Sequence, residues 1–231
     1  MIVLTGDTHR DFDRIFDFCE EYGTTLEDIL IILGDAGINY WQDASDRRLK
    51  RELSRLPVTL LCIHGNHEER PENISSYEEQ PWCGGLVYVE PEFPNLLFAR
   101  DGEIYDLNGC STLVIGGAYS IDKFWRLMNG ASWFPSEQPD EEIKRRTEAR
   151  LEKAGWRVDC VLSHTVPLPY MPRHAFLPGI DQSTVDNSTE EWLDTIERRL
   201  RYSRWYAGHF HVDCQEGPVR IVQNDFLELD I

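Results

Sequence analysis

Short apolar runs alternate with amphipathic segments over the first 66 residues of the chain. Residues 1–5, 28–35 and 58–66 are mostly apolar and have the length of buried strands. Residues 11–23 and 43–56 instead carry apolar side chains at the spacing of an amphipathic helix. The order strand, helix, strand, helix, strand predicts parallel strands joined by crossover helices.

The middle of the chain changes to short strand-like runs with turn residues between them. These runs are residues 85–90, 95–100, 103–107 and 111–117. Their length and their turns predict a second, partly antiparallel sheet. Strand-like runs return later in the chain, at residues 158–164, 204–210, 219–223 and 226–231.

Two further helices are predicted in the second half. Residues 139–155 begin with Pro139 and acidic side chains, at the end of a helix where the dipole favours negative charge. Residues 188–200 open with Ser188 and Glu191, which have the spacing of a capping box. Because no internal repeat or linker divides the chain, we expect a single domain over residues 1–231.

Two long segments, residues 118–139 and 165–188, have no clear helical or strand periodicity. The first is rich in aromatic side chains and the second in proline. Loops of this length in a compact domain are commonly the walls or lids of functional sites. We therefore expect both segments to shape specificity.

The charge balance changes the picture of possible partners. Lys and Arg together number 23 and Asp and Glu 41, so the net charge is −18. Such a surface repels polyanions and disfavours binding of long nucleic acids. A small phosphorylated substrate remains compatible with it, because a metal ion can reverse the local field in one cleft.

The six cysteines show no C-x-x-C spacing, which favours reduced thiols over a disulfide framework. No apolar run has the length of a membrane span, and the apolar start of the chain is too short for a signal-peptide core. These features predict a cytoplasmic protein without membrane association.

Candidate chemistry lies where the predicted strands end. Aspartate or histidine side chains follow or end several of the apolar runs, at Asp7, His9, Asp35, His64, His67, His164 and His209. Ligands of open α/β sheets bind at the carboxyl ends of strands, so these side chains are expected to converge. A glycine precedes each of Asp7, Asp35, Asn66 and His209, and would give the tight turns that let them face one pocket.

His209 and His211 stand one residue apart. On an extended segment their side chains would point to the same side, roughly 6–7 Å apart, and could reach two different ions. Imidazole and carboxylate suit Mn, Fe or Zn, and one carboxylate can bridge two ions. A pair of ions about 3.5–4 Å apart can clamp both ends of an in-line phosphoryl displacement.

Five blocks carry a resemblance to a known family. They are "GDTH" (6–9), "GD" (34–35), "GNHE" (65–68), the lone His164 and "GHFH" (208–211). In this order they resemble the calcineurin-like metallophosphoesterases. "GDTH" and "GNHE" also resemble the protein serine/threonine phosphatase branch, although "GDAGINYW" (34–41) stands where that branch has an Asp-Arg-Gly element.

The resemblance implies an α/β fold, a four-layer α/β/β/α sandwich of two mixed β-sheets flanked by helices. It implies two divalent or trivalent metal ions, with Mn, Fe and Zn as candidates. It assigns Asp7, His9 and His211 to one ion. It assigns Asn66, His164 and His209 to the other, with Asp35 as the bridge.

The resemblance also implies an activity. A metal-bridging hydroxide would attack phosphorus in a phosphomonoester or phosphodiester, with His67 as the general acid. The substrate would be a small phosphorylated molecule, a nucleotide or a phosphoprotein. The alternative is a non-catalytic, protein-binding scaffold of the same fold, which would be marked by loss of ligands or of His67; this chain keeps them all.

Other residues allow two interpretations. The fork-shaped donor Arg10, which stands where the family often has glycine, could contact a substrate phosphate. It could equally pair with an acidic residue of the next helix, Asp11, Asp13 or Asp17. We expect His64 to be structural, His174 to be exposed on its loop, and Phe210 to point away from the metals.

Overall fold

The computed structural model describes residues 1–229. Its first sheet contains β1 (Ile2–Thr5), β2 (Ile29–Ile32), β3 (Thr59–Cys62), β4 (Glu78–Trp82), β5 (Gly85–Val89), β6 (Leu96–Ala99) and β13 (Leu227–Glu228). The strand order is β13-β1-β2-β3-β6-β5-β4. Strands β1, β2, β3 and β6 are parallel, as the helical crossovers between the first three require. The remaining strands pair antiparallel at the two sides.

The second sheet contains β7 (Ile104–Leu107), β8 (Cys110–Ile115), β9 (Cys160–Ser163), β10 (Arg204–Ala207), β11 (Cys214–Glu216) and β12 (Val219–Ile221). Its order is β11-β12-β10-β9-β8-β7. Strands β8, β9, β10 and β12 are parallel, and hairpins add the two antiparallel edge strands. Both sheets are therefore mixed, and each has a parallel centre.

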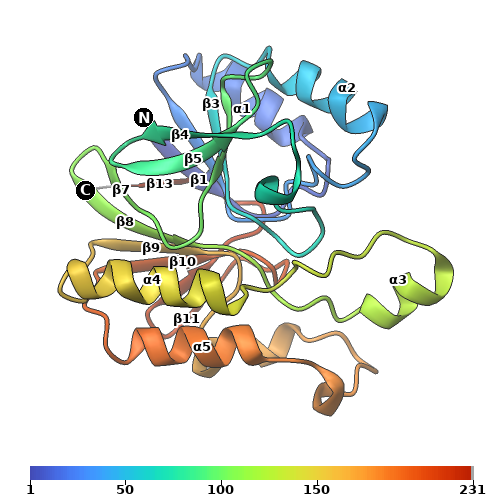
Figure 1. The fold of residues 1–231 in the computed structure, drawn as a ribbon, viewed down its shortest axis with the longest axis vertical. Helices are drawn as coiled ribbons and strands as arrows, with labels where there is room; N and C mark the ends of the chain where they lie inside the picture. Colours follow the sequence, from blue (N-terminus) through green and yellow to red (C-terminus); the bar gives the residue numbers. More distant parts are fainter. Residues whose placement is uncertain (230–231) are drawn as a thin grey trace.

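Residues 1–229 contain five α-helices: α1 (Asp13–Tyr22), α2 (Ala44–Leu53), α3 (Lys123–Asn129), α4 (Glu141–Lys153) and α5 (Ser188–Glu197). The 3-10 turns are η1 (Pro71–Asn73), η2 (Leu168–Tyr170), η3 (Arg173–Ala175) and η4 (Gln182–Thr184). Figure 1 shows α1 and α2 beyond the first sheet and α4 and α5 beyond the second, with α3 standing away from the layers. No helix within residues 1–229 is both long and apolar enough to cross a membrane.

Three hydrophobic clusters join the four layers. One packs α1 and α2 on the outer face of the first sheet, through residues such as Ile15 and Leu53. The second lies between the sheets, where Leu4 and Ile31 share a cluster with Leu162. The third packs α4 and α5 on the second sheet and includes Trp205. These clusters confirm the predicted α/β/β/α sandwich.

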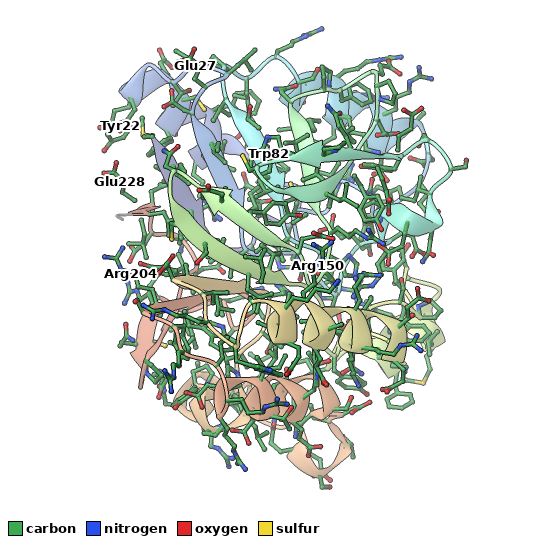
Figure 2. All side chains as sticks on the ribbon, turned by 60° about the vertical axis from the view of Figure 1, so that its left-hand side comes forward. Tyr22, Glu27, Trp82, Arg150, Arg204 and Glu228 are labelled. Atoms are coloured by element: carbon green, nitrogen blue, oxygen red, sulfur yellow. The ribbon has the colours of Figure 1, made fainter. Side chains whose placement is uncertain are left out.

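Individual side-chain contacts also link the layers. Trp82 of β4 meets Tyr105 of β7 edge to face, with ring centroids 5.7 Å apart. Arg150 of α4 donates to the buried carboxylate of Glu103, just before β7, at 2.6 Å. Figure 2 labels Trp82 and Arg150 and shows side chains filling the space between the ribbons.

Most predicted elements are confirmed within a few residues, but the division between sheets was wrong. Residues 85–90 and 95–100 extend the first sheet, as β5 and β6, instead of joining a separate second one. Pairing partners are long-range contacts that local periodicity does not encode. The pattern also missed α3 and the edge strands β4 and β11. Part of the last predicted strand, residues 230–231, lies outside the described residues.

The predicted capping box at Ser188 was wrong as well. Ser188 is the first helical residue of α5, and the preceding Asn187 makes no side-chain capping bond. The backbone N–H of Ser188 instead donates to Asp186, at 2.9 Å. A helix that begins one residue earlier than expected places the serine inside the first turn, where it cannot cap.

Candidate metal centre

Five strand ends bring together all the residues predicted to bind metal, together with His67. Asp7 and His9 follow β1, Asp35 follows β2, Asn66 and His67 follow β3, His164 follows β9, and His209 and His211 follow β10. Three of these strands belong to the first sheet and two to the second. The site therefore lies at the seam between the sheets, at their shared carboxyl end.

The backbone at these strand ends is in an uncommon conformation. His9, Asp35, His209 and His211 all have positive φ angles, of 46°, 46°, 69° and 51°. A non-glycine residue in this region costs on the order of 1–3 kcal/mol, and such residues cluster at functional sites. The expectation that "GHFH" is extended was therefore wrong, because the chain leaves β10 in left-handed turns.

The glycines that precede the candidate ligands mainly allow close packing against the site, and only one of them is needed for a left-handed turn. Of Gly6, Gly34, Gly65 and Gly208, only Gly34 has a positive φ, of 101°. A Cβ at Gly65 would lie 2.0 Å from Asp35 Oδ1, and one at Gly208 would lie 2.4 Å from Asp7 Oδ1. A side chain at either position would displace a carboxylate of the site.

The first cluster consists of Asp7, His9 and His211. Oδ1 of Asp7 accepts the backbone N–H of His209 at 2.9 Å, which fixes the carboxylate. Its Oδ2 is buried and makes no hydrogen bond of good geometry. This oxygen lies 3.3 Å from His211 Nε2 and 3.8 Å from His9 Nε2, and the two Nε2 atoms are 2.9 Å apart. Three donors of electron pairs thus converge on one point.

The second cluster is centred on Asp35 and His164. Nδ1 of His164 lies 2.8 Å from the carbonyl oxygen of Leu33, which can only accept. In a neutral ring the proton is then on Nδ1, so Nε2 presents a lone pair to Asn66 Oδ1, 2.8 Å away. The amide of Asn66 is oriented by its donation to Ser120 Oγ, at 2.9 Å. Two acceptors facing each other in a buried site are a natural environment for a cation.

The remaining residues connect the clusters. Oδ2 of Asp35 lies 3.8 Å from Nε2 of both His9 and His164, so the carboxylate stands between the two groups. The ring of His209 packs edge-on to that of His164, with centroids 4.9 Å apart. The ring of His211 packs in the same way against His9, also at 4.9 Å. The two histidines of "GHFH" thus lie with different clusters.

The electrostatics suit metal ligands. Burial raises the pKa of Asp7, but the contact with His211 and the other imidazoles outweigh it, so the net pKa is lowered and the carboxylate is ionised. Burial and the nearby His164 lower the pKa of His209 to about 3, so its ring is neutral. Contact with Asp7 raises the pKa of His211, so this ring must lose a proton before it can bind a metal ion. Ionised carboxylate and neutral imidazole are the forms that bind metal.

The donor set therefore fits metal ions. A buried carboxylate oxygen without a hydrogen bond and two opposed acceptors are unfavourable arrangements in a protein interior. A cation in either place would remove the repulsion. The mixture of carboxylate, amide and imidazole groups suits Mn, Fe or Zn.

His67 lies beside the clusters. Its backbone N–H donates to Asp35 Oδ1 at 2.8 Å, and its Nε2 is 4.0 Å from Asp35 Oδ2. The ring lines the cavity above the site. The adjacent Glu68 is fully buried and is not part of this lining, so it does not face the imidazole from the cavity.

Arg10 has a structural partner that the sequence did not reveal. Its guanidinium pairs with Asp46 of α2, donates to Gly37 O at 2.7 Å and reaches Ser45 Oγ at 3.1 Å. Pairing with Asp11, Asp13 or Asp17 was therefore the wrong expectation. Arg10 is also outside the cavity lining, so its position does not support contact with a substrate phosphate.

Three other residues clarify the surroundings. His64 is buried away from the cavity, and burial holds its pKa well below the ordinary value, which fits a structural role. His174 is exposed and pairs with Glu216 at 3.3 Å. Phe210 packs partly on the third hydrophobic cluster but also lines the cavity, so the expectation that it points away from the metals was only half right.

Sequence reasoning missed several groups around the candidate site. Ser120, which orients Asn66, and Asp122 both follow β8. The run "STLVIGGAYS" (111–120) was recognisable as a strand end of the same kind as the other five, so it carried a usable signal. The carbonyl of Leu33 had no such signal, because a backbone contact does not depend on the residue type.

Two mixed sheets with a carboxylate and imidazole cluster at their shared edge define an α/β sandwich with a candidate metal centre. The chain belongs to the calcineurin-like phosphoesterase family, whose sequence model matches residues 1–213. Membership indicates metal-dependent hydrolysis of phosphoesters and confirms the resemblance drawn from the five sequence blocks. No curated protein matches the chain.

Solved structures show the same fold. TT1561 of Thermus thermophilus is similar over 96% of this chain and 87% of its own, with a TM-score of 0.51 and 14% identity. A second crystal structure is similar over 96% of this chain and 89% of its own, with a TM-score of 0.50 and 13% identity. At such identities the likeness concerns the fold alone.

Proposed function

We propose that the protein is a dinuclear-metal-dependent phosphoesterase that hydrolyses phosphomonoester or phosphodiester bonds. The observation that carries the proposal is the convergence of unsatisfied electron-pair donors at the seam, centred on the buried Oδ2 of Asp7. Two neighbouring groups of candidate ligands that share Asp7 support two ions over one. Family membership supports the reaction class.

In this proposal Asp7, His9 and His211 hold one ion. Asn66, His164 and His209 hold the other, and Asp35 bridges them from its place between the clusters. The ions, when bound, would supply polarisation of the phosphoryl oxygens and a lower pKa for the attacking water. Mn, Fe and Zn are the candidates, because all suit imidazole and carboxylate together.

His67 acts as the general acid and protonates the leaving oxygen. The backbone N–H of His67 donates to Asp35 Oδ1, and this hydrogen bond keeps the ring beside the metal ligands. Burial lowers the pKa of His67, while the charge of Asp35 opposes this change. A phosphoryl group arriving next to the ring adds negative charge and favours the protonated form that the role requires.

The substrate is a small phosphorylated molecule, a nucleotide or a phosphoprotein. A net charge of −18 disfavours long nucleic acids, whose many phosphates would be repelled by the surface. The two long loops, residues 118–139 and 165–188, both contribute residues to the cavity above the candidate ligands. This position supports a role for them in substrate specificity.

The test is hydrolysis of p-nitrophenyl phosphate and of bis-p-nitrophenyl phosphate, with Mn(II) and again after chelation. We expect metal-dependent turnover of at least one ester. His67→Ala should keep its metals and lose roughly 10²–10⁴-fold in turnover. The exposed His174, outside the cavity lining, provides the matched His174→Ala control. A metal-loaded protein without turnover of either ester would refute the proposal.

A further inference from the structure

A cavity of about 470 Å³ opens directly above the candidate metal centre. At its floor lie Asp35, Asn66, His67, His209 and His211. Its walls come mainly from the two long segments, with Tyr119, Ile121 and Asp122 from the first and residues between Met171 and Asn187 from the second. A substrate whose phosphoryl group reaches the metal ligands would place its organic part between these walls.

One wall is aromatic and begins at a metal ligand. The ring of Phe210 packs edge-on to that of His209, with centroids 4.9 Å apart. The ring of Phe176 lies nearly parallel to that of Phe210, at 6.3 Å and an interplanar angle of 14°. Leu177 continues the apolar surface to the mouth, where 61% of the residue is exposed. Apolar side chains thus line the cavity both beside the candidate metal ligands and at an exposed position.

The charged groups in the cavity are of one sign. Among the described residues that line it there is no Lys or Arg, while Asp122 and Asp186 contribute carboxyl groups in addition to the ligand Asp35. Glu190 also lines the cavity, but burial raises its pKa to about 7. Asp186 is kept ionised by donation from Gln138 and from the backbone N–H of Ser188, at 3.1 Å and 2.9 Å. An anionic group on the organic part would meet repulsion at this wall.

One candidate cation near the cavity, Arg126, already has partners. Arg126 lies close enough to His67 for its charge to act on that ring. Its Nε donates to Asp122 Oδ2 at 2.7 Å, and its Nη1 donates to the hydroxyl of Tyr40 and the carbonyl of Ser132. Releasing this guanidinium to bind a second phosphate would break all three bonds.

We propose that the cavity accepts phosphoesters whose organic group is apolar and carries no negative charge beyond the phosphoryl group at the metals. Nucleoside diphosphates and triphosphates and acidic phosphopeptides are excluded by the same argument. The inference rests on the proposed function, because it assumes that the phosphoryl group binds at the metal ligands.

The test is a series of n-alkyl phosphates from ethyl to hexyl, assayed with the metal-loaded enzyme. If only diesters are cleaved, the series is the p-nitrophenyl n-alkyl phosphates. The reactivity of the ester changes little along each series, so chain length reports burial. We expect kcat/KM to rise roughly fourfold per methylene until the cavity is filled. An ω-carboxyalkyl phosphate of equal length should be a poorer substrate than its alkyl counterpart.

Variants locate the effect. Phe176→Ala should flatten the dependence on chain length, and Asp186→Asn should improve the ω-carboxyalkyl ester relative to the alkyl ester. Phe124→Ala is the matched control, because Phe124 is an exposed aromatic residue of α3 outside the cavity lining, and it should keep the wild-type slope.

Two outcomes separate this inference from the proposed function. Metal-dependent turnover with no dependence on chain length would overturn the inference and leave the function standing. If no ester is hydrolysed, calorimetric binding of n-alkylphosphonates to the metal-loaded protein still tests the cavity. Affinity that rises with chain length and falls in Phe176→Ala would support it, and affinity independent of chain length would overturn it.

Discussion

Gly34 offers the sharpest test of how tightly the site is packed. Its φ of 101° is strained for any L-residue, and an added Cβ would lie 2.0 Å from Nδ1 and 2.5 Å from Cγ of His164. Gly109, in the turn between β7 and β8, has a φ of 87° and nothing within 4 Å of an added Cβ. The pair therefore shares the backbone strain and differs in the clash.

The expected magnitudes follow from this comparison. An alanine with a left-handed backbone costs about 1–2 kcal/mol, which applies to both variants. The overlap with the buried imidazole adds about 1–3 kcal/mol in Gly34→Ala alone. Since about 1 kcal/mol shifts the Tm of a chain of this size by roughly 2–4 °C, Gly34→Ala should melt several degrees below Gly109→Ala.

The assay is thermal unfolding of both variants in chelator, followed by elemental analysis after reloading with metal. Gly34→Ala should also hold less metal than Gly109→Ala, because the His164 ring must move away from its contact with Leu33. The reasoning is refuted if the two variants share one Tm and one metal content. A lower Tm with full metal content would show that the ring adjusts without leaving the site.

Three further predictions concern other groups. Asp35→Asn should reduce the content of both ions, because the carboxylate stands between the two clusters. If elemental analysis finds two ions per chain in this variant, Asp35 does not act as the bridge. Asp101→Asn leaves the buried guanidinium of Arg70 without its counter-charge and should lower the free energy of unfolding by about 3–5 kcal/mol, with an unchanged urea midpoint as the contrary result. Burial raises the pKa of Glu190 to about 7, so the folded chain keeps a proton that the unfolded chain releases near its ordinary pKa of 4.5. The stability that this proton provides is lost as the pH rises from 4.5 to 7. Glu190→Gln cannot release the proton, so its stability should not show this loss. If the urea midpoints of the wild type and of Glu190→Gln change equally between pH 5 and pH 8, the prediction is refuted.

The strand ends could be predicted from sequence because two local signals coincide there. An apolar run such as "IILGD" (31–35) gives both the strand and its end, and the family blocks give the order of the ligands. Since the carboxyl ends of parallel strands gather at one edge, convergence follows without knowledge of the packing. The convergence of the candidate metal ligands was therefore accessible from sequence.

The contacts around the ligands were not accessible in the same way. Arg10 pairs with Asp46, 36 positions away, because the turn after β1 carries its side chain toward α2. The nearby acidic residues in and before α1 are not its partners. The middle strands divided between two sheets for a similar reason, since pairing depends on long-range packing. The sequence predicted only that two long loops form the cavity wall. The structure adds that Phe176, Asp186 and Phe210 line the same cavity, which gives the wall its aromatic and acidic character.

The close approach of Asp7 to His209 and of His9 to His211 joins positions 202 apart in the chain. Such contacts form only after both sheets have docked, so the site is among the last parts of the molecule to be completed during folding. Ions that bind this site and not the unfolded chain stabilise the docked state by mass action. Metal supply would then govern the lifetime of the folded chain as well as its chemistry.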